Sequence, residues 1–74
     1  MGDFDVEFDQ YDNAKAVHRE YGHEYEFVIV REEKPHVRGG TVRQNQRADR
    51  DYHEFAEAAR AAVEKAAREK GLIL

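Results

Sequence analysis

A chain of 74 residues forms one domain, expected to span residues 1–74, and buries only about 60% of the surface that its unfolded form exposes. The lack of Cys excludes disulfides and thiolate zinc sites, whereas a hydrophobic content of 41% argues against a disordered chain. The formal net charge is −4, so any surface that attracts anions must be local.

The first two predicted elements differ in their periodicity. Residues 3–9 alternate strictly between acidic and apolar side chains, which is typical of a strand with one buried and one solvated face. Residues 12–22 predict a short helix, because Asp12 can cap its first turn and Gly22 can close its last one. A weak alternation within residues 15–18 supports the competing interpretation, in which this segment is a second strand.

A strand and a hairpin are predicted in the middle of the chain. Residues 24–32 are rich in aromatic and β-branched side chains and apolar on both faces at their centre, so this strand should lie inside the sheet. Pro35 follows and interrupts it. Gly39 and Gly40, which stand between segments that contain Val, predict the two-residue turn of a β-hairpin, because both positions can adopt positive φ.

The last predicted element is a long helix. Asp49 or Asp51 can cap its start, and Gly71 should end it after about Lys70. Its apolar residues recur at helical spacing and form one stripe, and their small size lets the helix lie close to a sheet. The stripe consists of Phe55, Ala59, Ala62, Val63 and Ala66.

The succession of elements predicts an α+β fold. A small single sheet of three to four strands carries the long C-terminal helix, and the short helix near residues 12–22, on one face. A ferredoxin-like βαββαβ order fits this succession. The alternative is a three-stranded sheet centred on residues 24–32 with one long helix across it, because residues 41–44 are too polar for the central strand that the ferredoxin-like order requires.

The residue types exclude several kinds of function. The chain has no Ser and no Cys, which removes the commonest nucleophiles, and no apolar pocket is predicted around its carboxyl groups. The four His, at positions 18, 23, 36 and 53, do not follow metal-ligand spacings and are expected at the surface or half-buried. We therefore predict no catalytic residue, no metal site, no cofactor and no small-molecule substrate, and we do not expect an enzyme.

The sequence contains neither an apolar run long enough to cross a membrane nor a signal-peptide pattern, and these two observations predict the location of the protein. The longest apolar run, residues 27–30, is far shorter than the roughly 20 residues that cross a bilayer. Residues 1–5 are acidic and lack the basic and apolar regions of a signal peptide. We expect a soluble, cytoplasmic protein with no membrane partner.

Charge is distributed unevenly along the chain. Residues 1–33 hold ten acidic and three basic residues (net −7), residues 34–50 one acidic and five basic (net +4), and residues 51–74 five acidic and four basic (net −1). Arginine predominates in the basic segment, and its planar guanidinium group matches phosphate and carboxylate oxygens. The hypothesis is an anion-binding surface on the predicted hairpin and the start of the last helix. Its candidate residues are Lys34, Arg38, Arg43, Arg47 and Arg50.

The predicted function is that of a small non-enzymatic binding module whose partner is a nucleic acid or an acidic protein surface. One alternative is a module for protein–protein contact or self-association, such as a homodimer formed through a sheet edge. Another is an artificial or orphan scaffold without biochemical activity, such as a de novo design, because the missing Ser and the capped helix suit a regular sequence. In these alternatives the basic residues only protect a hairpin edge or pair with the acidic first strand.

Overall fold

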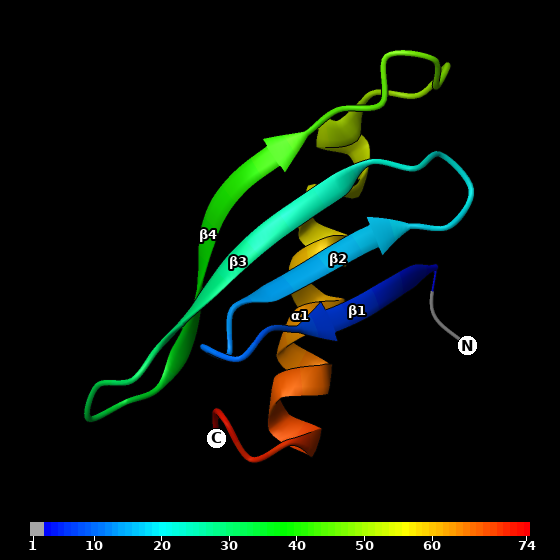
Figure 1. Cartoon of the computed structure of the whole chain (residues 1–74). Helices are drawn as coiled ribbons and strands as arrows, with labels where there is room; N and C mark the ends of the chain where they lie inside the picture. The colour runs from blue at the N-terminus through cyan, green and yellow to red at the C-terminus, as the bar shows by residue number, and fades with distance from the viewer. Residues whose placement is uncertain (1–2) are drawn as a thin grey trace.

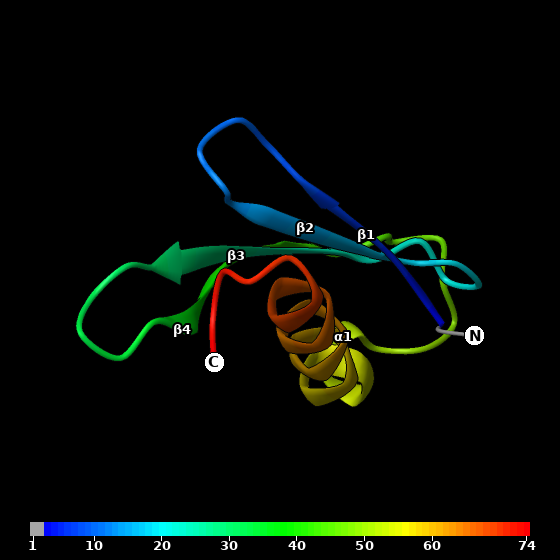
Figure 2. The ribbon, with the colours of Figure 1, turned by 90° about the horizontal axis from the view of Figure 1, so that it is seen from below.

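Four strands form one antiparallel sheet in the order β1-β2-β3-β4, and a single helix covers one of its faces (Figures 1 and 2). This arrangement comes from a computed structural model, which describes residues 3–74. It confirms the predicted α+β class, with one sheet and a long C-terminal helix. The elements are β1 (Phe4–Phe8), β2 (Ala14–His18), β3 (Glu24–Val30), β4 (His36–Arg43), a 3-10 turn η1 (Tyr52–Phe55) and α1 (Ala56–Glu69).

The segment after β1 is a strand, so the prediction of a helix at residues 12–22 was wrong. The Asp9 carboxylate accepts hydrogen bonds from the backbone N–H groups of Tyr11 (2.8 Å) and Asn13 (2.9 Å), which closes a turn and sends the chain back along β1. Residues Ala14–His18 then pair antiparallel with β1. The ferredoxin-like order needs a helix here, so it is not the order observed. Local capping signals were outweighed by strand pairing with both neighbours.

The core lies between α1 and the face of the sheet that this helix covers. Ala14 and Ala16 of β2 are only 2% and 0% exposed, and their small side chains allow α1 to pack close to the sheet. The predicted stripe on the helix is largely confirmed, although its last buried residue is Ala67 and not Ala66. The buried apolar residues are Phe4, Ala14, Ala16, Tyr25, Phe27, Ile29, Val37, Ala59, Val63, Ala67 and Ile73.

Both ends of the C-terminal helical region follow the sequence signals. The Asp51 carboxylate accepts a hydrogen bond from the His53 backbone N–H (2.8 Å), which caps η1 and lowers the pKa of Asp51. Gly71 has a φ of +77°, and the Leu72 N–H donates to the Ala67 carbonyl (2.8 Å), so the chain leaves the helix in a left-handed turn. Within the part of the chain that the structure describes, no helix has the length and apolar character needed to cross a membrane.

Gly39 and Gly40 lie inside β4, so the predicted hairpin turn at these residues was wrong. The chain reverses at residues 31–35 instead. At Glu26 of β3 the register shifts, and this one residue faces both Gly40 and Thr41 of β4, which is a β-bulge. A Cβ on Gly40 would lie 2.8 Å from the Glu26 carbonyl oxygen. Glycine is therefore needed for a close approach of two strands, a role that its sequence context does not distinguish from a turn.

Candidate anion-binding surface

The bulge places two of the candidate arginines on the same face of the sheet. Arg38 stands opposite Val28, and Arg43 stands opposite Glu24. Residues opposite each other project from one face, and both of these partners belong to the open face, the one turned away from α1. Side chains five positions apart in a regular strand point to opposite faces. The extra residue of the bulge at Gly40 turns the following side chains to the other face. Arg38 and Arg43 therefore lie on the same face, about 15 Å apart.

A buried histidine anchors the segment that carries the other two arginines. His23 is 0% exposed; its Nδ1 accepts from the Asn45 backbone N–H (3.0 Å), and its Nε2 lies 2.8 Å from the Arg50 carbonyl, to which it donates. One ring thus holds both ends of the loop 44–51. The expectation of exposed or half-buried His was wrong for His23 and for His18, which is 5% exposed. No local signal marks His23, because its partners lie 22 and 27 positions away.

The amide side chain of Asn45 fixes the position of Arg47. Asn45 donates from Nδ2 to the Tyr21 carbonyl (2.8 Å), which ties the loop to the turn between β2 and β3. The Arg47 backbone N–H in turn donates to the Asn45 Oδ1 (3.2 Å). The backbone of Arg47 is held, whereas its side chain is exposed to solvent.

The candidate arginines differ in whether a carboxylate neutralises them. Arg50 donates from Nε to the Glu54 carboxylate (2.9 Å), and this contact lowers the pKa of Glu54 and raises that of Arg50. Arg38, Arg43 and Arg47 form no ion pair with any carboxylate of residues 3–74. The other arginines that do form ion pairs are Arg19 with Asp5, Arg31 with Asp12, and Arg60 with Glu64.

The fifth candidate, Lys34, lies away from the others. It belongs to the turn 31–35 between β3 and β4, whereas Arg43 ends β4 at the opposite end of the strand (Figure 1). The eight residues of β4 span about 25 Å. The five predicted residues therefore do not converge on one point. Three of them, Arg38 and Arg43 on the open face of β4 and Arg47 in the loop 44–51 that follows, form no ion pair among residues 3–74 and are called the arginine row from here on.

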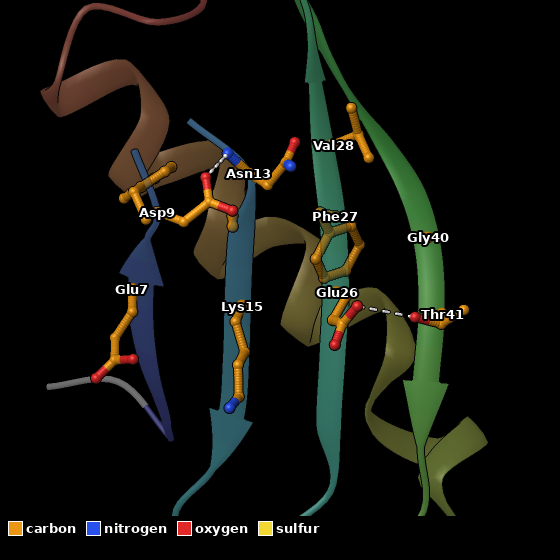
Figure 3. A pocket seen from close by; sticks show the side chains of 11 residues that line it. Glu7, Asp9, Asn13, Lys15, Glu26, Phe27, Val28, Gly40 and Thr41 are labelled. Carbon is orange, nitrogen blue, oxygen red and sulfur yellow. Dashed lines mark hydrogen bonds between the residues drawn. The ribbon is translucent and has the colours of Figure 1, made fainter. Parts of the chain in front are cut away.

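The rest of the open face limits where an anion can bind. A concavity of about 460 Å³ is lined by residues of β1, β2, β3 and β4 and of the turn after β1. Figure 3 shows the carboxylates of Glu7, Asp9 and Glu26 among its lining side chains. The Thr41 hydroxyl donates to one Glu26 oxygen (3.0 Å). These carboxylates repel a polyanion laid across the whole sheet, so contact is confined to the β4 side. Among residues 3–74 no group of three or more His, Cys, Asp or Glu side chains is arranged to hold a metal ion.

Comparisons with known proteins add no relative to this description. Neither the protein-family models, nor the curated proteins, nor the solved structures contain a match to the chain. The assignment of a role therefore depends on the arrangement of side chains in this structure.

Proposed function

We propose that the protein is a non-enzymatic module that binds an anionic macromolecule through the arginine row. The observation that carries this proposal is the separation of the arginines into two groups. Arg19, Arg31, Arg50 and Arg60 each have a carboxylate partner, and Arg68 donates to the Leu74 carbonyl (3.0 Å), whereas the side chains of the three arginines in the row have no partner within residues 3–74. Guanidinium groups without an internal carboxylate partner keep their charge and their donors for an external phosphate or carboxylate.

The phosphate backbone of a nucleic acid is the partner that this geometry favours. Arg38 and Arg43, about 15 Å apart on the edge strand β4, and Arg47 in the loop that follows can contact several phosphates, which repeat every 3.4 Å or so along one strand of a duplex. Phosphates attract such a row without any requirement for sequence. Glu24 and Glu26 lie on the same face beside Arg43, so we expect weak binding with a dissociation constant on the order of micromolar at low salt.

Salt-dependent binding tests this proposal. The triple variant Arg38→Ala, Arg43→Ala, Arg47→Ala should bind a fluorescently labelled oligonucleotide at least about tenfold more weakly than wild type, with the slope of log K against log salt reduced by about 2 to 3. The reason is that each lost phosphate contact releases one counterion fewer. Fluorescence anisotropy over a series of salt concentrations gives both quantities.

A matched control separates the position of the charges from their number. The control variant Arg31→Ala, Lys65→Ala, Arg68→Ala also removes three positive charges, but from other parts of the surface. It should bind the oligonucleotide almost as tightly as wild type does. Equal losses in the two triple variants would contradict the proposal, as would a wild-type protein that binds no polyanion at low salt. Binding to polyglutamate but not to oligonucleotides would instead identify an acidic protein surface as the partner.

A further inference from the structure

A second surface feature lies beside the turn between β2 and β3. It is a hollow of about 550 Å³ whose wall consists of three aromatic rings. The ring centroids of His18 and Phe55 are 4.4 Å apart, those of His18 and Tyr21 5.2 Å, and those of Tyr21 and Phe55 5.3 Å. The charged residues around the hollow are Asp3, Arg19, Glu20 and Arg50.

The imidazole of His18 offers a hydrogen-bond donor to this hollow. Its Nδ1 accepts from the backbone N–H groups of Glu20 (3.2 Å) and Tyr21 (3.1 Å), so the ring proton of the neutral form resides on Nε2. Nε2 has no hydrogen-bond partner among residues 3–74, although the residue is 95% buried, with 5% of its surface exposed. Among residues 3–74 no side-chain N or O atom is both fully buried and without a hydrogen-bond partner. His18 is a lining residue of the hollow, so this N–H is the ring donor available to a ligand there.

The two arginines around the hollow are neutralised within the protein, and Asp3 and Glu20 have no ion-pair partner among residues 3–74, so the hollow offers no free positive charge. Arg19 is paired with Asp5 (2.8 Å), and Arg50 is paired with Glu54 (2.9 Å). The nearby Glu20 carboxylate raises the pKa of the Tyr21 hydroxyl. A ligand of this hollow is consequently recognised by ring stacking and by one N–H donor more than by net charge. A nucleobase has this chemistry, since it is flat, uncharged and rich in acceptor atoms.

The hollow is also connected to the arginine row. Asn45 donates to the Tyr21 carbonyl (2.8 Å) and accepts from the Arg47 backbone N–H (3.2 Å), so one side chain joins the two features. The loop that carries Arg47 is therefore tied to the backbone of Tyr21, whose ring lines the hollow. Three aromatic rings of the strands, those of Phe4, Tyr25 and Phe27, are by contrast buried in the core.

We propose that this hollow binds an unpaired nucleobase of a single-stranded nucleic acid, with the base against Tyr21 and hydrogen-bonded to the His18 N–H. The inference rests on the proposed binding of phosphates by the arginine row. A base within a duplex is paired and stacked and cannot enter the hollow. The protein therefore prefers single strands to duplexes of equal length.

Two tyrosine substitutions test the base site. Tyr21→Leu keeps an apolar side chain in the cluster but removes the aromatic face, and it should lower the affinity for a labelled thymidine strand about tenfold while leaving duplex affinity unchanged. Tyr11→Leu is the matched control, because Tyr11 is 74% exposed in the turn between β1 and β2, and it should change neither affinity. Anisotropy titrations at one fixed low salt concentration measure all four values.

The outcomes distinguish the two proposals. If Tyr21→Leu binds the single strand and the duplex with wild-type affinities, the base site is overturned and the arginine row is not. If the wild-type protein binds neither nucleic acid, both proposals are overturned. If Tyr21→Leu does not fold, the His18 Nε2–H resonance of the wild type decides the matter. It should shift as the thymidine strand is added and stay unchanged with the duplex, and the absence of any shift with the strand would overturn the base site.

Discussion

His23→Ala is expected to destabilise the fold by about 3 to 5 kcal/mol. The substitution leaves the Asn45 N–H and the Arg50 carbonyl without their partner and opens a cavity where a fully buried ring stood. A domain of 74 residues is stable by only about 4 to 11 kcal/mol in total, so this is a large share. Urea unfolding followed by circular dichroism measures the loss.

A second histidine provides the control for this experiment. The His53 ring contacts the Asp51 side chain and the neighbouring Tyr52 ring (centroids 4.1 Å apart), but 73% of the side chain is exposed, so His53→Ala should change the unfolding midpoint far less than His23→Ala. A loss below about 1 kcal/mol in His23→Ala would contradict the anchoring role of this ring. Because the loop 44–51 carries Arg47, we also expect His23→Ala to bind oligonucleotides more weakly under conditions in which it remains folded.

Gly40→Ala is expected to cost about 2 to 3 kcal/mol. The new Cβ would lie 2.8 Å from the Glu26 carbonyl oxygen, and neither atom can move away by side-chain rotation, so the bulge must open. Gly39→Ala is the matched control in the neighbouring position. No atom lies within 4 Å of a Cβ at Gly39, and this variant should be neutral or up to about 1 kcal/mol more stable, since alanine reduces the freedom of the unfolded chain.

The same substitution links the fold to the proposed site. If Gly40→Ala removes the bulge, Arg38 and Arg43 return to opposite faces, and oligonucleotide affinity should fall although every arginine is still present. Gly39→Ala should retain wild-type affinity. A Gly40→Ala protein with wild-type stability and wild-type binding would show that the bulge does not organise the arginine row.

The elements predicted correctly are those whose signals are local and repeated. Residues 3–9 and 24–32 carry strand patterns over seven or more positions, and the helix has a cap at Asp51 and a left-handed Gly71. The five-residue strand β2 carries only a short alternation with alanines, which strands do not favour, and it exists because β1 and β3 pair with it. Pairing between distant segments is not encoded in either segment alone.

The candidate site shows the same division between local and distant information. Net charge identifies the basic segment 34–50, but the ion pair between Arg50 and Glu54 joins the loop to the turn η1 and lies outside α1, so helical spacing does not predict it. The common face of Arg38 and Arg43 was not predictable, because Gly40 had been assigned to a turn. Which arginines remain without a carboxylate depends on contacts that only the folded chain brings together.

Nuclear magnetic resonance on the wild-type protein tests the central claim most directly. An isotopically labelled sample is titrated at low salt with a short single-stranded oligonucleotide, and the Nε–H resonances of the arginines are followed. The account predicts that the signals of Arg38, Arg43 and Arg47 shift together and that added salt reverses the shifts, while those of Arg31 and Arg60 stay in place. Shifts confined to the paired arginines or to β1, or no shift at all, would contradict it.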